Sequence, residues 1–171
     1  MEETFAQIFI ADIRRRLFDE SLVRIHTCLD TLTEEEIWYR PNINSNSIGN
    51  LVLHLNGNIR QWILTGLGKY KDTRIRQLEF DEQGPLPKVD LLHRFDTTFN
   101  DVSVVLDQLE TEILTRKIIV QGFEETGISI LIHVAEHLSY HTGQITYITK
   151  MLKNKDLNYY GGKNLDIIVN C

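Results

Sequence analysis

The chain has 171 residues, which fits one domain with a sizeable hydrophobic core, so we expect residues 1–171 to form a single domain. Apolar residues make up 42% and charged residues 25% of the chain, as in ordinary globular proteins. Twenty-four acidic residues outnumber 18 basic ones, giving a formal net charge of −6. This balance argues against nucleic-acid and membrane-surface binding, because both partners select for basic surfaces.

The amino terminus lacks the pattern of a secretory signal. Acidic residues precede the basic run Arg14–Arg16, the reverse of the usual order, and no apolar stretch approaches the roughly 20 residues that a membrane helix needs. We therefore expect a cytoplasmic protein. Cys28 and Cys171 lie far apart and form no Cys-x-x-Cys pair, so we expect two free thiols in a reducing compartment.

Apolar residues recur close to the helical period in four long segments, and the three prolines lie outside all of them. These predicted helices span residues 3–29, 47–65, 89–114 and 128–152. A short helix is also predicted for residues 33–38, where Thr33 and Glu36 form a capping box before Pro41. Because strand signal is scarce, the pattern predicts an all-α fold, a four-helix bundle.

Residues 69–87 make a long connection between the second and third predicted helices. We expect this segment to be ordered by packing or to be functional. A crossover of this length lets the two helices run parallel, so the topology need not be up-down-up-down. Residues 117–120 are predicted to be extended, and the apolar tail 165–169 is expected to pack along the bundle or to reach a partner chain.

Three of the six histidines, His133, His137 and His141, share the last predicted helix at a spacing of four. Neighbours at this spacing lie on one helix face, and two such imidazoles can bind one metal ion. His133 and His141 are about 12 Å apart along the helix axis, so they cannot share an ion. On the helical wheel His141 lies nearest to the apolar stripe and His133 farthest from it. The pair His137 and His141 is therefore favoured.

A third ligand must come from another part of the chain. His54 lies at the edge of the apolar stripe of the second predicted helix, which suits a site in a cleft of the bundle. His26 and His93 are rivals, because sequence spacing excludes neither of them. A lone histidine is usually hydrogen-bonded or solvated, and this is the default interpretation of His26, His93 and His133.

Residues 133–145 read His-Val-Ala-Glu-His-Leu-Ser-Tyr-His-Thr-Gly-Gln-Ile, a pattern in which His-x-x-x-His is followed by x-Gly-Gln-Ile. This stretch resembles the last-helix signature of the DinB/YfiT-like metalloenzyme superfamily. Residues 47–55 resemble the second-helix motif that supplies the first histidine of that superfamily. The resemblance covers nearly the whole chain. It implies a four-helix bundle with a three-histidine metal site formed by His54, His137 and His141.

The resemblance also implies a function. The superfamily includes transferases and isomerases that use low-molecular-weight thiols such as bacillithiol or mycothiol. We therefore expect a homodimeric, metal-dependent enzyme of the thiol S-transferase type that acts on a small electrophilic substrate. Two alternatives stay open, a hydrolase that uses metal-bound water and a non-catalytic metal-binding or ligand-binding module. Many relatives have arginine at the position of Thr142, so the ligand of this chain could differ.

Three neutral imidazoles suit zinc or nickel and leave the ion an open coordination position. Such an ion lowers the pKa of bound water and favours a thiolate over a thiol. Beyond the metal ligands the sequence assigns no catalytic residue. Gly143 is expected to let another helix approach closely, because glycine destabilises a helix interior. The polar side chains expected to bind substrate or to orient a ligand are Asn50, Asn58, Gln61 and Gln144.

Overall fold

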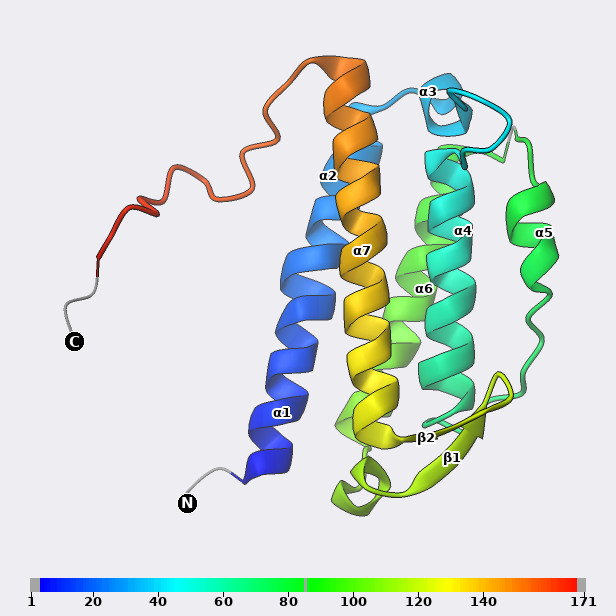
Figure 1. The fold of residues 1–171 in the computed structure, drawn as a ribbon, viewed down its shortest axis with the longest axis vertical. Coiled ribbons are helices and arrows are strands. Elements are labelled where there is room, and N and C mark those ends of the chain that lie inside the picture. Colours follow the sequence, from blue (N-terminus) through cyan, green and yellow to red (C-terminus); the bar gives the residue numbers. More distant parts are fainter. Residues whose placement is uncertain (1–3, 85, 169–171) are drawn as a thin grey trace.

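Four long helical rods stand side by side in the computed structural model, which describes residues 4–84 and 86–168 (Figure 1). The first two rods each join α-helix to π-helical turns without a break, and the other two are single α-helices. In chain order the rods are α1 (Phe5–Arg14), π-helical turns (Arg15–Leu22) and α2 (Val23–Thr31); α4 (Ile48–Ile59) and π-helical turns (Arg60–Thr65); α6 (Lys88–Asp107); and α7 (Gly127–Lys153). The predicted all-α fold of four long helices is confirmed.

Shorter elements link the rods. They are α3 (Glu34–Trp38), α5 (Arg76–Asp81), a 3₁₀ turn (Thr111–Leu114) and the antiparallel strands β1 (Lys117–Val120) and β2 (Phe123–Thr126). Thr33 and Glu36 close the predicted capping box of α3, each side chain accepting from the backbone N–H of the other residue. β1 is the predicted extended stretch. β2 pairs with it across a turn at Gln121 and Gly122, both with positive φ, which the apolar pattern does not reveal.

The third rod is shorter than its apolar pattern predicts. α6 ends at Asp107 instead of continuing to residue 114, because the chain turns there and crosses the end of the bundle. Leu109 and Ile113 nevertheless pack against the core. The apolar spacing therefore continues past the end of the helix, because it reports burial and not helical conformation alone.

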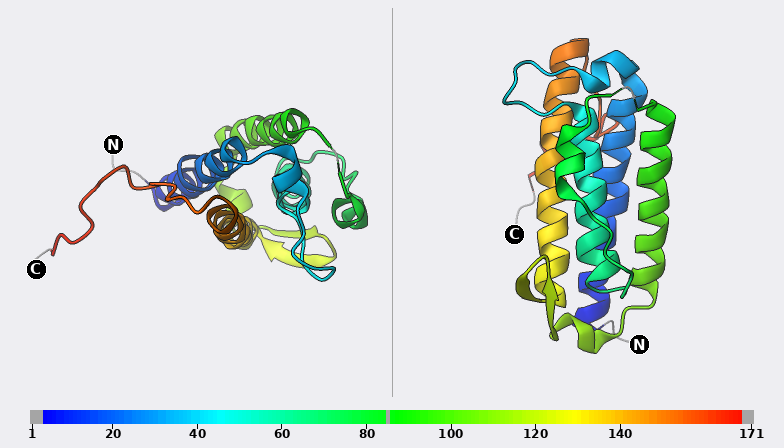
Figure 2. Two further views of the ribbon diagram at one scale, coloured as in Figure 1. Left: turned by 90° about the horizontal axis from the view of Figure 1, so that it is seen from above. Right: turned by 90° about the vertical axis from the view of Figure 1, so that its right-hand side faces the viewer.

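α4 and α6 run parallel. In Figure 1 the first rod rises from the amino terminus, α4 and α6 both descend, and α7 rises, and the side view in Figure 2 agrees. Residues 66–87 therefore carry the chain from the foot of α4 back to the head of α6, and α5 packs against α4 on the way. This is the arrangement that so long a connection allows, and the described part of the segment packs on α4 through α5.

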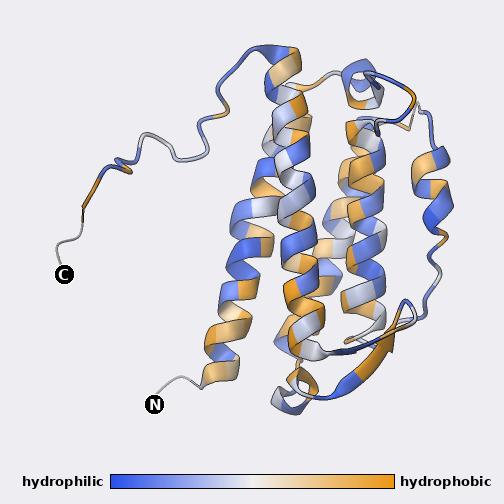
Figure 3. Ribbon diagram, in the orientation of Figure 1, coloured by the Kyte–Doolittle hydropathy of each residue, from blue (hydrophilic) through white to orange (hydrophobic). Residues whose placement is uncertain are grey.

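The core fills the space between the rods. Ile25, Leu55, Phe95 and Leu138, one from each rod, are completely buried. Figure 3 shows hydrophobic and hydrophilic residues alternating around each helix, so every rod has an apolar side. Burying a side chain of this size stabilises the fold by about 1.5–3 kcal/mol. This packing brings α4 and α7 into contact along their length and fixes which of their residues face each other.

The chain leaves the bundle after α7. Asn154 ends this helix with a positive φ of 46°, and the segment beyond it runs away from the rods (Figure 1). Leu165, Ile167 and Ile168 are exposed, so the expectation that the tail packs along the bundle is wrong for these residues. Val169, the last residue of the predicted apolar tail, lies outside the described residues.

Of the two cysteines, Cys28 is buried and is a free thiol, whereas Cys171 lies outside the described residues. Over residues 4–84 and 86–168, none of the helices is both long and apolar enough to cross a lipid bilayer.

Candidate metal centre

Three histidines meet where α4 faces α7. One ring nitrogen from each of His54, His137 and His141 lies within 4.8 Å of the other two. His54 Nε2 and His137 Nε2 are 2.9 Å apart, and the ring centroids of His137 and His141 are 4.6 Å apart. A cluster of this kind can hold a metal ion. The structure thus brings together the same three histidines that the family resemblance indicates.

Local sequence explains where these rings lie. Ser47 and Asn50 form a capping box that starts α4, and His54 follows one turn after Asn50 on a buried face of the helix. His137 and His141 lie one turn apart in the middle of the 27-residue α7. The two helices therefore present three imidazoles from rigid backbone rather than from loops.

Glu79, on α5, orients the ring of His54. Its Oε2 lies 2.9 Å from His54 Nδ1, and a carboxylate can only accept, so His54 donates from Nδ1 and presents Nε2 to the cluster. Arg74 donates to Glu79 through two nitrogens, Nε to Oε1 at 2.7 Å and Nη2 to Oε2 at 2.9 Å. Burial alone would raise the pKa of Glu79, but the hydrogen bonds from Arg74 and His54 outweigh it and lower the pKa. The carboxyl group therefore stays ionised.

The two histidines of α7 that belong to the cluster, His137 and His141, are held neutral. Burial, together with the neighbouring His141 and His54, lowers the pKa of His137 to about 3. Burial also lowers the pKa of His141, even though Gln144 Oε1 lies 2.7 Å from its Nδ1 and accepts from it. His141 therefore directs Nε2 away from Gln144. Neutral imidazole is the form that coordinates metal ions.

Two of the other predicted polar residues, Asn50 and Gln61, stabilise the site indirectly. Asn50 donates from Nδ2 to the backbone oxygens of Glu79 and Glu82, at 2.9 and 2.7 Å, and so fastens α5 to α4. Gln61 accepts from Arg74 at 2.9 Å and donates to Asp72 at 2.8 Å. Neither side chain touches the histidines. Both instead support the segment that carries Glu79.

Asn58 differs from these residues, because part of its amide is unsatisfied. Its Nδ2 lies 3.4 Å from His133 Nε2, whereas its buried Oδ1 has no hydrogen-bond donor among the described residues. His133 is not in the cluster, and its ring stacks on Trp62 with centroids 3.8 Å apart. Asn58 therefore offers a free acceptor one helical turn beyond His54.

The remaining candidate histidines lie away from the cluster. His26 Nε2 is 2.7 Å from Asp96 Oδ1, which joins α2 to α6, and His93 is exposed on α6. Thr142 is buried and donates to the backbone oxygen of Leu138 at 2.7 Å. Its hydroxyl is thus already used within α7.

Sequence analysis missed Arg74 and Glu79, and Gly57 is the signal that points to them. A Cβ at Gly57 would overlap Glu79 Oε1 and lie 2.9 Å from Arg74 Nε, so only glycine lets the pair lie against α4. Gly143 behaves differently, because no atom lies within 4 Å of the position of its missing Cβ. The expected close helix approach at Gly143 is therefore wrong within the described chain.

Residues 4–161 match the family described as "Protein of unknown function (DUF1572)". The chain belongs to this family. A DinB-like protein, YjoA, from Bacillus subtilis has a similar crystal structure, with a TM-score of 0.66 at 20% identity, covering 87% of this chain and 96% of that one. A conserved protein from Enterococcus faecalis is similar with a TM-score of 0.68 at 16% identity, covering 90% of this chain and 100% of that one. No curated protein matches the sequence. These likenesses confirm the predicted DinB-like fold for this DUF1572 protein.

Substituting alanine for Gly57 and for Gly143 should change the free energy of unfolding in opposite directions. Gly57→Ala forces Glu79 and Arg74 away from α4 and should lower the free energy of unfolding by about 1–3 kcal/mol, as overpacking does. Gly143→Ala adds a methyl group to open space in a helix and should raise it by about 0.5–1 kcal/mol. Urea unfolding followed by circular dichroism measures both. Equal stabilisation by the two substitutions would mean that Glu79 does not lie against Gly57.

Proposed function

We propose that His54, His137 and His141 bind one zinc or nickel ion and that this DUF1572 protein is a metal-dependent enzyme. The observation that carries the proposal is the convergence of these three imidazoles, one ring nitrogen of each lying within 4.8 Å of the others. An all-nitrogen donor set suits both ions. The 2.9 Å between His54 Nε2 and His137 Nε2 is also a separation that two ligands of one ion, each bonded at about 2.0–2.1 Å, can reach.

The hydrogen bonds around the histidines support the same proposal. Metal-binding histidines usually donate their remote N–H to a carboxylate or carbonyl oxygen, which fixes the tautomer. His54 donates to Glu79 and His141 to Gln144 in this way, so both direct Nε2 toward the cluster. The burial of Glu79 and its two hydrogen bonds from Arg74 keep this orientation rigid.

The reaction that we propose is transfer of a low-molecular-weight thiol to a small electrophilic substrate. A bound zinc or nickel ion supplies positive charge and an open coordination position, which favours the thiolate form of a thiol. Glu79 holds the proton on His54 Nδ1, and Asn58 Oδ1 is free to accept a hydrogen bond from the thiol or the substrate. The resemblance to the DinB/YfiT-like superfamily favours thiol transfer over hydrolysis.

Thr142 affects which thiol fits. Where a relative's arginine could bind a carboxylate, this chain has a buried hydroxyl that is bonded to Leu138. We therefore expect weaker selection for an anionic thiol such as bacillithiol than in relatives that have arginine. A hydrolase that uses water in place of the thiol, or a non-catalytic metal-binding module, are the alternatives that the assays below distinguish.

Metal content tests the ligand set. Purified wild-type protein should hold about one zinc or nickel ion per chain after metal loading. His54→Ala and His137→Ala should each lose it, because two imidazoles bind far more weakly than three. His133→Ala is the matched control, because His133 shares α7 but stacks on Trp62 outside the cluster. Elemental analysis gives the stoichiometry, and metal loss in the control equal to that in His137→Ala would refute the assignment.

Paired assays test the reaction. Formation of a fluorescent thioether from monochlorobimane should require both metal and thiol, and should vanish in His137→Ala while persisting in His133→Ala. Cysteine, glutathione and bacillithiol serve as the thiols. Thiol-independent hydrolysis of 4-nitrophenyl acetate by the loaded protein would instead favour the hydrolase. Loaded protein that is inactive in both assays would favour the non-catalytic module.

The superfamily resemblance also leads us to propose a homodimer, and the surface of α7 supports it. Tyr140, Tyr147 and Met151 are exposed at 62%, 72% and 52%, and they lie on one stripe of the helix beside the open position of Gly143. Exposed apolar stripes of this kind often mark interfaces between protein chains.

Light scattering after size exclusion tests the dimer. The wild type should elute at about twice the 19.9 kDa of one chain, and Tyr147→Asp should shift it toward one chain by placing a charge in the stripe. Asp19→Asn, on the exposed surface of the first rod, is a control that should leave the mass unchanged. A wild-type mass of one chain at micromolar concentration would contradict the dimer.

A further inference from the structure

A groove lies between the first rod and α7, and Figure 2 shows the tail leaving the bundle on the side of these two rods. The groove encloses about 590 Å³. Phe9 and Ile13 line it from the first rod. Ile132, Ala135 and Tyr140 line it from α7. Because Tyr140 also belongs to the exposed stripe of α7, the groove continues the surface proposed for the homodimer.

The tail remains in contact with the bundle as far as Tyr159. The Tyr159 hydroxyl lies 2.9 Å from Thr146 Oγ1 on α7 and 3.2 Å from Cys28 Sγ on α2. The guanidinium carbon of Arg24, a residue that also lines the groove, lies 5.4 Å from the centroid of the Tyr159 ring. The point at which the tail separates from the bundle is therefore next to the groove.

A tight turn then directs the chain away from its own groove. The N–H of Gly161 donates to the backbone oxygen of Asn158 at 3.1 Å. Gly161 and Gly162 have positive φ values of 56° and 77°, which glycine adopts without strain. Figure 1 shows the segment that follows, residues 163–168, running away from the rods. This segment, the arm, thus owes its direction to a hydrogen-bonded turn.

The arm is apolar although it is surrounded by solvent. Leu165, Ile167 and Ile168 are 64%, 71% and 85% exposed, and none of them packs against the core. Figure 3 shows the end of the described tail to be hydrophobic. Three large apolar side chains within six residues are unfavourable in water, so the arm gains stability by packing on a second apolar surface.

The free charges of the groove and of the arm are complementary. Within the described residues, two ionic side chains of the groove have neither an ion pair nor an aromatic partner, Arg16 on the first rod and Glu136 on α7. The arm carries one charge of each sign without an ion pair to any described residue, Lys163 and Asp166. Opposite signs therefore match Asp166 with Arg16, and Lys163 with Glu136. Three residues of extended chain span about 10 Å, enough to reach from one helix to its neighbour.

We infer that the arm of one copy lies in the groove of a second copy, and that the two copies exchange arms reciprocally. Leu165 and Ile167 pack against the apolar walls of the groove, and Asp166 pairs with Arg16. Exchange of an identical segment forms the same contact twice and is a common route to a dimer. The inference rests on the proposed homodimer and names the segment that joins its two copies.

Disulfide cross-linking tests whether the arm reaches a second chain. Two chains of different size are co-expressed, one with Ile167→Cys in the arm and one with Ala135→Cys in the groove, both with Cys171→Ser. Oxidation with glutathione disulfide should link the two chains on a non-reducing gel. Gln77→Cys, exposed on α5, replaces Ala135→Cys as the control and should give no link. A disulfide that forms only within a chain carrying both substitutions would show the arm in its own groove and would overturn the inference.

Dimer dissociation measured by sedimentation tests the apolar contact. Ile167→Asp should raise the Kd of the dimer at least about tenfold, because it places a charge where an apolar side chain packs. Asn164→Asp adds the same charge to a polar residue of the arm and should change the Kd by less than about threefold. An unchanged Kd in Ile167→Asp, or an equal rise in both variants, would contradict the arm's placement.

A charge exchange tests the proposed ion pair. Asp166→Arg and Arg16→Asp should each raise the Kd by roughly three- to tenfold, and the double variant should return it to within about twofold of the wild type. A double variant no tighter than either single variant would refute the pairing.

The outcomes separate this inference from the proposals on which it builds. A wild-type mass of two chains without an arm-to-groove link would refute arm exchange and leave the homodimer standing, whereas a mass of one chain would refute both. His137→Ala should cross-link as the wild type does, because no residue of the histidine cluster lines the groove.

Discussion

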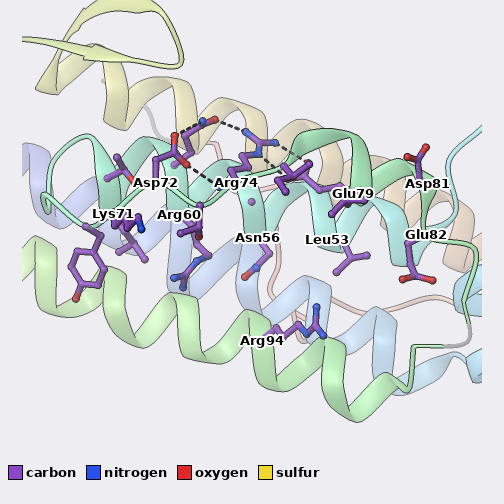
Figure 4. A pocket seen from close by; sticks show the side chains of 18 of the residues that line it. Leu53, Asn56, Arg60, Lys71, Asp72, Arg74, Glu79, Asp81, Glu82 and Arg94 are labelled. Carbon is purple, nitrogen blue, oxygen red and sulfur yellow. Dashed lines mark hydrogen bonds and ion pairs between the residues drawn. The ribbon is translucent and has the colours of Figure 1, made fainter.

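The buried carboxylate of Glu79 is the interaction on which the candidate site depends. Removing a lone carboxylate from water costs several kcal/mol, so Glu79 can lie against α4 only because other groups share its charge. Arg74 supplies two hydrogen bonds and His54 a third. The same contacts fix the tautomer of His54, and Arg74 and Glu79 also line a cavity of about 640 Å³ on the crossover side of α4 (Figure 4). One ion pair thus connects two parts of the molecule that could bind ligands.

The parallel arrangement of α4 and α6 is what makes this contact possible. A short antiparallel connection would leave no chain over the outer side of α4. The long crossover instead lays α5 along it, where Asn50 holds the backbone of Glu79 and Glu82 and Arg40 holds that of Phe80. Topology, and not only the choice of ligands, therefore determines the environment of His54.

Much of this architecture could be predicted from the sequence, because its signals are local. Helical periodicity locates four rods, and a spacing of four places His137 and His141 on one helix face. The third histidine, His54, was identified by resemblance, because spacing along the chain carries no information about contacts between α4 and α7. Helical periodicity also overestimated the length of α6, since Leu109 and Ile113 pack against the core although they lie beyond the end of this helix.

The missed residues depend on contacts distant in sequence. Arg74 and Glu79 lie in a polar stretch without helical periodicity, and their side chains are buried where the crossover segment packs on α4. Gly57 was the available signal, because glycine destabilises a helix interior and its presence there usually has a structural cause. Such a reason can be a close contact, as at Gly57, or an open surface, as at Gly143, and the sequence alone does not distinguish the two.

The shortness of α5 has a kinetic consequence. A helix of six residues has little stability of its own, so this segment is ordered by its contacts with α4 rather than by its own backbone hydrogen bonds. It can therefore detach while the four rods stay folded, as a unit of low local stability. Each detachment would free His54 from its carboxylate and expose the ring to solvent. Exchange of a metal ion at the proposed three-histidine site would then depend on the opening of this one segment and not on global unfolding.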